Sequence, residues 1–327
     1  MNTQLQQIDA LKNQLNKQII GQQKLVDSLI IALLANGHLL VEGAPGLAKT
    51  RAIKSLSNLI EGSFHRVQFT PDLLPGDITG TEIYHPQDGT FAFQKGPIFH
   101  SLVLADEINR APAKAQSALL EAMGERQVSV GKTTYPLPEL FLVMATQNPI
   151  EQEGTYPLPE AQLDRFLLHV EIDYPDREAE HQILKLARSE ASPNRSANIE
   201  SDSDSFKILE QQTIFEARDQ LLSIYMAEPV EEYIVQLIMA TRQPEQYDAK
   251  LASWLEYGAS PRGTIAIDAC ARAHAWMADR DFVTPEDVQA VIHDVLRHRI
   301  IPSFEAEASG INSNQLIDQL LNVVPAI

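Results

Sequence analysis

The stretch of sequence that decides the fold is Val41-Glu42-Gly43-Ala44-Pro45-Gly46-Leu47-Ala48-Lys49-Thr50. A short apolar run, residues 38–41, leads into it, and residues 52–60 follow it with apolar side chains at helical spacing. The order of strand, glycine-containing loop and helix is typical of a phosphate-binding loop. In such a loop the backbone N–H groups face a phosphate at the helix N-terminus, Lys49 reaches the outer phosphates and the Thr50 hydroxyl binds magnesium.

One position departs from the general pattern, which has glycine directly before the lysine. Ala48 occupies that place. Alanine readily adopts helical dihedral angles, so the loop can still close if Ala48 lies in the first helical turn. A simple turn with an incidental Lys-Thr pair is the alternative interpretation, which the downstream motifs make less favourable. The candidate nucleotide-binding residues in the loop are Gly43, Ala44, Pro45, Gly46, Leu47, Ala48, Lys49 and Thr50.

Length and composition favour a two-domain globular protein. The chain has 327 residues, of which 44% are hydrophobic and 21% charged, and a single core seldom holds so many residues. The net charge of −18 argues against broad contacts with a nucleic-acid backbone, although a local basic channel in a ring stays compatible with it. Cys270 is the single cysteine, so no intrachain disulfide forms, and we expect a buried thiol in a reducing compartment.

The N-terminal region predicts two helices and no targeting signal. Residues 1–17 are polar, and the apolar run 29–35 is too short to span a bilayer. We therefore expect a cytoplasmic protein without direct membrane insertion. A helix is expected over residues 1–18. A second, over 22–35, has a broad apolar face placed to cover a bound adenine, to pack on the sheet, or to do both. Gly21 and Gln22, at the break between the two helices, are further candidate nucleotide-binding residues.

Two β-hairpins are predicted within the strand–helix alternation. After a strand at 64–69 and a turn-rich stretch at 70–80, residues 81–84 and 90–93 flank Asp88-Gly89. Residues 127–130 and 134–137 flank Gly131-Lys132 in the same way. Because inserted loops often carry recognition, we interpret the first hairpin as an insertion with such a role.

Two adjacent acids, Asp106 and Glu107, follow a buried apolar strand that begins near residue 101. Carboxylates at the carboxyl edge of a parallel sheet, beside a phosphate loop, suit metal and water chemistry. Asp106 would bind Mg²⁺, through a water molecule, and Glu107 would polarise the attacking water. A solvated strand end is the alternative, and the phosphate loop roughly 55 residues upstream makes it less favourable.

The next fully apolar strand, residues 140–146, is expected at the centre of the sheet and ends in Gln147-Asn148-Pro149. Asn148 would then lie near Glu107 and orient water or contact a γ-phosphate, although this stretch taken alone favours a simple Asn-Pro turn. Arg165 precedes a last core strand at 167–171. Its guanidinium either stays within its own subunit or acts on a neighbour's phosphates as an arginine finger.

The sequence of the C-terminal part predicts a helical domain that follows a linker. Residues 189–206 are rich in serine, asparagine and acids. Helices are expected over 211–222, 230–241, 261–279 and 284–299, the last with Thr284 as N-cap, Pro285 at its first position and Asp287 three residues after the cap. Arg262 opens the third of these helices, where it is either a surface residue or able to reach over a nucleotide.

Together these motifs resemble the MoxR family of AAA+ ATPases, over nearly the whole chain. The matching stretches are residues 43–50, 68–75, 105–111, 145–149, 163–166 and 260–263. The resemblance implies an α/β fold, namely an AAA+ P-loop parallel-sheet domain of αβα layers with inserted β-hairpins, followed by a small all-α lid domain. The implied boundaries are 1–188 for the core with inserts near 70–95 and 127–137, 189–206 for the linker and 207–327 for the lid. Alanine before the lysine is common in this family.

The resemblance also implies roles for individual residues. Residues 43–50 match Walker A, and Asp106 with Glu107 match Walker B. Asn148 matches sensor 1, Arg165 the arginine finger and Arg262 sensor 2. The implied catalytic residues are therefore Glu107, Asn148, Arg165 and Arg262, and the implied Mg²⁺ ligands are Thr50 and Asp106.

Family members are chaperone-like ATPases that hydrolyse MgATP and generally form hexameric rings. They typically work with proteins that carry von Willebrand factor A domains and help mature, metallate or assemble client complexes. The resemblance therefore implies ATP and Mg²⁺ as cofactors, a homo-hexamer, such a partner and no nucleic acid. The alternatives are the ATPase subunit of a metal chelatase, a nucleic-acid-directed AAA+ motor and a nucleotide-gated scaffold.

Overall fold

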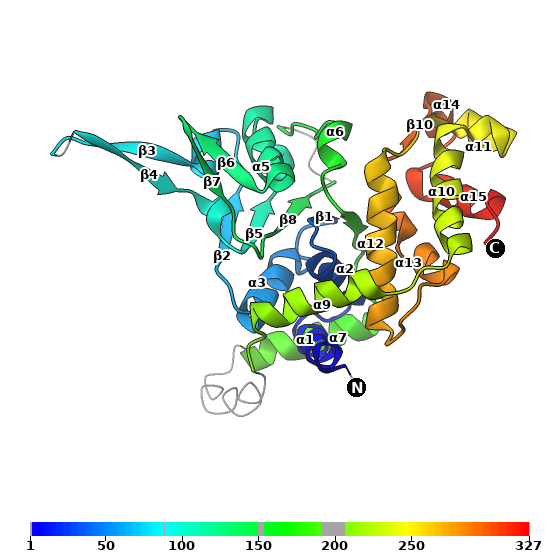
Figure 1. Ribbon diagram of the computed structural model, residues 1–327, viewed down its shortest axis with the longest axis horizontal. Coiled ribbons are helices and arrows are strands. Elements are labelled where there is room, and N and C mark those ends of the chain that lie inside the picture. The colour runs from blue at the N-terminus through cyan, green and yellow to red at the C-terminus, as the bar shows by residue number, and fades with distance from the viewer. Residues whose placement is uncertain (1, 88, 150–153, 191–206, 327) are drawn as a thin grey trace. The chain divides into compact units, whose positions relative to one another are not determined.

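The structure, a computed structural model, describes residues 2–87, 89–149, 154–190 and 207–326. The chain divides into two units (Figure 1). Unit 1 comprises Met1–Ile30, Leu40–Pro157 and Glu171–Phe215, and unit 2 comprises Ile31–Leu39, Leu158–Val170 and Glu216–Ile327. Residues 191–206 of the expected linker lie outside the described residues, and helix α7 continues to Glu190. The domain boundaries expected from the sequence stay a prediction.

A five-stranded sheet in the order β2-β5-β8-β1-β9 forms the framework of the nucleotide-binding fold. The strands are β1 (Leu39–Glu42), β2 (Phe64–Gln68), β5 (Leu102–Asp106), β8 (Leu142–Gln147) and β9 (Leu168–Glu171). Strand β5 pairs in parallel with both β2 and β8, and all five of its residues are buried. Strands covered on both faces read as continuous apolar runs, which explains why the sequence predicts β8 at the centre. The strand order confirms that position.

Helices of unit 1 bury apolar side chains. They include α1 (Thr3–Gln18), α3 (Lys49–Leu59), α5 (Ala113–Glu125) and α7 (Arg177–Glu190), and α2 (Gln23–Leu34) crosses the boundary between the units. In α1, Leu5, Ile8, Leu11 and Leu15 are buried, at the spacing of one helix face. The Asn2 side chain caps this helix by accepting hydrogen bonds from the first-turn backbone N–H groups. The two expected N-terminal helices are thus present.

Both predicted hairpins are present as antiparallel pairs. Strands β3 (Gly80–His85) and β4 (Thr90–Lys95) form the first, which Figure 1 shows extending beyond the sheet, and the one-turn helix α4 (Pro75–Thr79) precedes it. Strands β6 (Gln127–Val130) and β7 (Thr133–Pro136) form the second. The rings of Phe93 and Tyr135 stack with centroids 4.2 Å apart. The stack fastens the two hairpins to each other.

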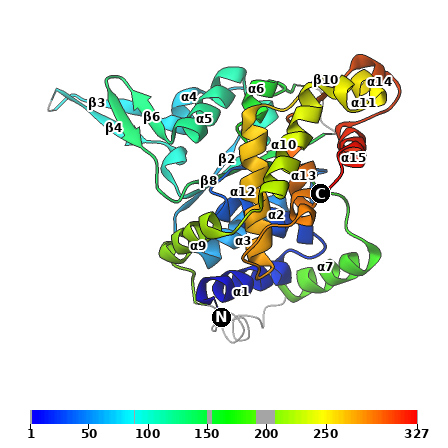
Figure 2. The same ribbon diagram turned by 45° about the vertical axis from the view of Figure 1, so that its right-hand side comes forward.

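Unit 2 is mainly helical (Figure 2). Its helices are α10 (Glu228–Arg242), α11 (Ala249–Trp254), α12 (Pro261–Met277), α13 (Pro285–Leu296), α14 (Phe304–Ala308) and α15 (Ser313–Val323), and α9 (Gln211–Ser223) crosses the boundary between the units. A short pair, β10 (Leu255–Tyr257) with β11 (Ile301–Pro302), accompanies them. The pattern in the sequence misses this pair, α11 and α14, because short elements carry little periodicity. The sequence-based prediction also misses α15, although this helix has 11 residues and a capping box formed by Asn312 and Gln315. It correctly places the four longer helices.

The junction of α12 and α13 is organised around a buried carboxylate. Thr284 and Asp287 form the expected capping box, with Pro285 at the first helical position. Burial opposes ionisation of Asp287, but hydrogen bonds from Arg280 and His274 hold its pKa well below the usual range. The single cysteine is buried in α12, as expected, and burial raises the pKa of its thiol.

Three consecutive basic residues, Arg297, His298 and Arg299, are buried where α13 ends. Nε2 of His298 lies 3.1 Å from the backbone oxygen of Phe166. Burial of the imidazole, followed by the positive charge of Arg299, lowers the pKa of His298 well below its ordinary value. The folded protein therefore keeps this histidine neutral.

We expect a stability that decreases as the pH falls below about 6.5, the pKa of an unperturbed histidine. The unfolded chain binds a proton at residue 298 in this range and the folded chain does not, so this group lowers the free energy of unfolding by up to about 1.4 kcal/mol per pH unit. Urea midpoints at several pH values between 7.5 and 5.5 measure the effect.

His298→Gln should weaken that pH dependence, whereas His181→Gln, at an exposed position of α7, should leave it unchanged. An identical pH dependence in wild type and His298→Gln would contradict the assignment.

Candidate functional site

The phosphate loop connects β1 to α3, and the sign of its backbone φ angle alternates from Gly46 to Ala48. Gly46 has φ +86° and Ala48 has φ +60° and ψ 15°, whereas φ of Leu47 is not positive. Ala48 is the N-cap of α3 in a left-handed conformation, so the loop closes without the helical Ala48 that the sequence analysis considered. The reason is geometric. Residues that alternate in the sign of φ turn their successive N–H groups to one side and create an anion-binding concavity. A helical conformation at Ala48 would disrupt this concavity.

The amino group of Lys49 links the phosphate loop to the end of the central strand. Its Nζ donates to the backbone oxygens of Gly43, at 2.5 Å, and Gln147, at 3.1 Å. The backbone N–H of Gly43 donates to the same Gln147 oxygen at 3.4 Å. The ammonium group is thereby held at the carboxyl end of β8.

Thr146, the residue before Gln147, holds the two acids. Its hydroxyl donates to Oδ1 of Asp106 at 2.6 Å and accepts a hydrogen bond from the backbone N–H of Glu107 at 2.9 Å. Arg66 on β2 donates to the other oxygen of Asp106, Oδ2, from Nη2 at 2.7 Å and from Nε at 3.0 Å. Both carboxylate oxygens of Asp106 therefore have a fixed partner.

Glu107 leaves the end of β5 in a left-handed conformation, with φ +56°. Its Oε2 accepts hydrogen bonds from Nε2 of Gln68, at 2.8 Å, and from Nη1 of Arg110, at 2.9 Å. These two contacts set the direction of the carboxylate. Asn148 is buried two residues beyond Thr146, at the same strand end.

Sequence analysis assigns no role to Arg66, Gln68, Arg110 or Thr146. Gln68, Arg110 and Thr146 lie in the family motifs. The parallel pairing of β5 with β2 and β8 brings Gln68 and Thr146 to the acids, whereas Arg110 is only three residues from Glu107 along the chain. Arg66 lies outside those motifs, and its alternation with Gln68 along β2 is the sequence signal that points both side chains to one face.

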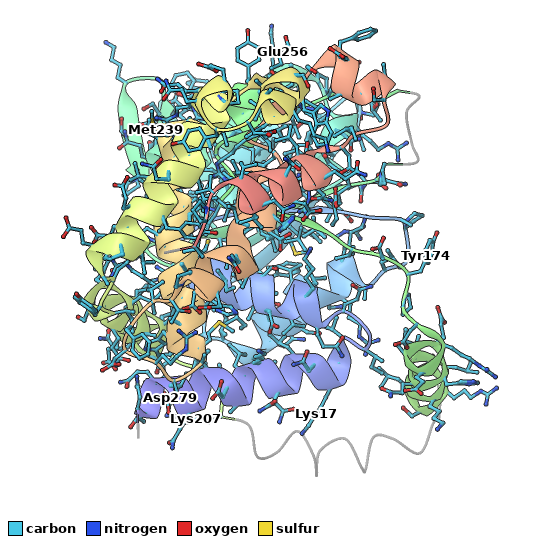
Figure 3. The ribbon with its side chains drawn as sticks, turned by 90° about the vertical axis from the view of Figure 1, so that its right-hand side faces the viewer. Lys17, Tyr174, Lys207, Met239, Glu256 and Asp279 are labelled. Carbon is cyan, nitrogen blue, oxygen red and sulfur yellow. The ribbon has the colours of Figure 1, made fainter. Side chains whose placement is uncertain are left out.

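A pocket of about 380 Å³ lies beside the phosphate loop, within unit 1. Its walls come from the loop, the α1–α2 connection and helix α7 with the segment before it. Figure 3 shows Tyr174 on that segment. The lining residues are Gln18, Ile20, Gln22, Pro45, Gly46, Leu47, Ala48, Arg51, Tyr174, Pro175, Glu180, Ile183, Leu186 and Ala187. A mainly apolar pocket with a few polar groups, next to a phosphate loop, suits a nucleotide base.

The two predicted nucleotide-binding residues Gly21 and Gln22 lie in the α1–α2 connection, and of the two only Gln22 lines the pocket. Gln22 is 6% exposed, and its Nε2 donates to the backbone oxygen of Asp173 at 2.8 Å. Gly21 has φ +76°, and a Cβ at this position would lie 2.8 Å from Cβ of Ala179. Gln22 therefore lines the pocket, whereas Gly21 allows the connection to pack against α7.

The candidate Mg²⁺ ligands, Thr50 and Asp106, provide oxygen atoms only. No group of three or more acidic, histidine or cysteine side chains able to hold a metal occurs among the described residues. Mg²⁺ usually takes one or two protein oxygens together with substrate phosphates and waters. The residues present therefore fit Mg²⁺ bound together with a nucleotide.

Arg165 and Arg262 belong to unit 2. Arg165 follows helix α6 (Glu160–Leu163) and is half-buried. Arg262 is exposed at the start of α12, where its backbone N–H donates to the Ser260 hydroxyl at 3.1 Å. Their roles toward a nucleotide stay predictions.

The parallel sheet, the phosphate loop and the helical unit together define the fold of an AAA+ ATPase. Residues 38–168 match the family model described as "ATPase family associated with various cellular activities (AAA)", and residues 251–320 match that of the AAA lid domain.

Sequence relatives and a solved structure identify the family within the AAA+ class. The chain is 45% identical to the chaperone MoxR1 of Mycobacterium tuberculosis, over 94% of this chain and 78% of that protein. It is 32% identical to the protein MoxR of Methylorubrum extorquens, over 96% and 94% of the two chains. A crystal structure of a protein from Cytophaga hutchinsonii matches with a TM-score of 0.88 and 44% identity, over 99% and 96% of the chains. The chain belongs to the MoxR family of AAA+ ATPases.

Membership of this family supports ATPase activity and nucleotide binding. It is also consistent with assembly into an oligomeric ring. Within the described part of the chain, no helix has both the length and the apolar character needed to cross a membrane.

We expect Ala48→Gly to stabilise the protein, because glycine adopts φ +60° without the steric cost that alanine has there, about 1 kcal/mol. The matched control is Ala10→Gly, at an exposed position within α1, where glycine should destabilise by about 1 kcal/mol. Urea unfolding of both variants measures the two opposite shifts. A loss of stability in Ala48→Gly would contradict the left-handed conformation.

Proposed function

We propose that the protein hydrolyses MgATP and uses the reaction to remodel client proteins. One observation carries the proposal. Two consecutive residues of β8 connect the phosphate loop with the acids: Thr146 binds Asp106 and Glu107, and the carbonyl of Gln147 accepts from Lys49. A cation for phosphate oxygens and a carboxylate for water thus share one strand end, as phosphoryl transfer to water requires.

In the proposed mechanism, the backbone N–H groups of residues 46–49 and the Lys49 ammonium bind the β- and γ-phosphates. Thr50 and Asp106 would hold Mg²⁺, which neutralises developing charge on the phosphate oxygens. Glu107, directed by Gln68 and Arg110, orients the attacking water and accepts its proton. Asn148 helps to orient that water, and the pocket beside α7 holds the base.

In the proposed mechanism, two arginines of unit 2 keep the roles that the family resemblance implies. Arg165 acts on the nucleotide of a neighbouring subunit in a homo-hexameric ring, where such a group contributes about 10³–10⁵ in rate. Arg262 contacts the γ-phosphate in its own subunit. Loss of the γ-phosphate releases that contact and allows the lid to move.

The hairpins are the proposed client-facing part. Tyr84 and Phe91 on the β3–β4 hairpin are 51% and 67% exposed, with ring centroids 5.1 Å apart. Exposed aromatic side chains suit contact with a protein chain. The chaperone name of the MoxR1 relative supports this function. Following the family resemblance, we propose a cytoplasmic protein that acts with a von Willebrand factor A domain partner to mature client complexes or insert their metal cofactors.

We expect Glu107→Gln to bind ATP with an affinity near that of the wild type but to lose turnover by about 10²-fold or more, because the amide does not accept the proton of the attacking water. Glu121→Gln, an exposed change on α5, is the matched control and should keep the wild-type rate. Phosphate release and calorimetric binding measure the two properties. Wild-type turnover by Glu107→Gln would refute the mechanism.

Mixing two inactive variants tests the trans role of Arg165. Arg165→Ala subunits keep an intact phosphate loop, and Lys49→Ala subunits keep an intact finger, so mixed rings should regain part of the ATPase rate that either variant alone lacks. The rate is measured against mixing ratio. A flat response at every ratio would argue against a finger supplied by the neighbour.

A further inference from the structure

The residues next to Arg165 and Arg262 meet at one carboxylate, that of Asp164. Its Oδ1 accepts a hydrogen bond from Nε of Arg299 at 2.9 Å, and its Oδ2 accepts one from the Ser260 hydroxyl at 2.8 Å. Ser260 is the N-cap of α12, and its hydroxyl accepts from the Arg262 N–H. Asp164 therefore connects the loop that carries Arg165 with the helix start that carries Arg262.

Arg299 holds the loop that carries Asp164 and Arg165 at the end of α13. Its side chain is 2% exposed. Besides Asp164, it donates to the backbone oxygens of Phe166, at 2.6 Å, and Leu167, at 3.1 Å. Burial lowers the pKa of Arg299, and the neighbouring charge of Asp164 acts in the opposite direction. The planar guanidinium thus fixes residues 164–167 in one geometry, which the point charge of a lysine would not do.

The start of α12 packs on the same arginine. A Cβ at Gly263 would lie 3.5 Å from Cδ of Arg299 and 3.2 Å from Cβ of Ala259, so little room separates the helix start from the arginine stem. The positive charge of Arg262 also acts on the Arg299 guanidinium. Figures 1 and 2 both place α6 near the N-terminal end of α12.

We propose that Asp164 is a positioning residue that holds Arg165 and Arg262 on one rigid piece of unit 2. The inference rests on the roles proposed above for the two arginines. A lid movement that displaces Arg262 then displaces Arg165 as well. The nucleotide state of one subunit is thereby passed to the neighbouring site that its Arg165 serves. The Asp164–Arg299 pair is suited to this purpose, because an ion pair with a buried arginine defines geometry more than it adds stability.

The sharpest variant is Ser260→Ala, which removes the hydroxyl between Asp164 and α12 and leaves the Asp164–Arg299 pair intact. Its matched control is Ser303→Ala. Ser303 is also an N-cap, of α14, and its hydroxyl accepts from the Ala306 N–H at 3.2 Å. Both variants lose a helix cap, but only the first loses the link to Asp164. Ser260→Thr keeps a hydroxyl and serves as the conservative variant.

We expect Ser260→Ala to lower kcat about tenfold or more, since small displacements of a positioned group cost rates of this order, and to raise KM for ATP through Arg262. Ser303→Ala should leave both constants unchanged, and Ser260→Thr should recover most of the rate. In an Arg165→Ala background, Ser260→Ala should lower kcat by a much smaller factor than in the wild type, because the part of the loss that acts through Arg165 is already present. Equal kinetics of Ser260→Ala and Ser303→Ala, or losses that multiply in the double variant, would overturn the proposal.

Two further measurements separate this inference from the proposed function. A wild-type kcat in Arg165→Ala alone would reject the arginine finger. Hydrogen exchange tests the link itself, without reference to catalysis: amide protection of residues 164–167 should fall in Ser260→Ala and persist in Ser303→Ala. Unchanged protection in Ser260→Ala would overturn the positioning role whatever Arg165 does.

Discussion

The hydrogen bonds of Thr146 and Gln147, at the end of strand β8, are the interactions on which the rest of the site depends. The register of the parallel strands brings the ends of β2, β5 and β8 to one sheet edge, where Thr146 holds both acids and Gln147 holds Lys49. Parallel strands align their carboxyl ends as a consequence of topology. A change of one residue in the register of β8 would turn the Thr146 hydroxyl to the other face of the sheet and separate it from the acids.

The same site contains local strain. Ala48 and Glu107 are non-glycine residues with positive φ, one at the N-cap of α3 and one directly after β5. Each costs about 1–3 kcal/mol and persists because the surrounding structure determines it. At Ala48 the conformation curls the phosphate loop, and at Glu107 it turns the carboxylate toward Gln68 and Arg110. In both places the strain serves the direction of a functional group.

The helical unit depends on a different constraint, which is the satisfaction of buried cations. Arg297 and Arg299 are nearly inaccessible, and they donate to backbone oxygens of residues 166–169 and to the carboxylates of Asp294 and Asp164. A buried guanidinium without these partners would be strongly destabilising. The end of α13 and the segment after α6 therefore fold as a single arrangement, and Arg165 is part of it.

The sequence by itself determined the parallel α/β core, its central strand, both hairpins and the longer lid helices, because hydrophobic periodicity and turn residues are local signals. It also located Lys49, Asp106 and Glu107, since their motifs are contiguous.

Only the tertiary structure decided which residues hold Lys49, Asp106 and Glu107. Thr146 and Gln68 reach the acids through strand pairing, and Arg66 through the same register. The left-handed conformation of Ala48 was likewise decided by closure of the loop on the sheet rather than by the conformational propensity of alanine. The hydrogen bond between Asp164 and Ser260 joins residues 96 positions apart. Such long-range contacts leave no periodic trace along the chain, which is the physical reason that sequence patterns do not reveal them.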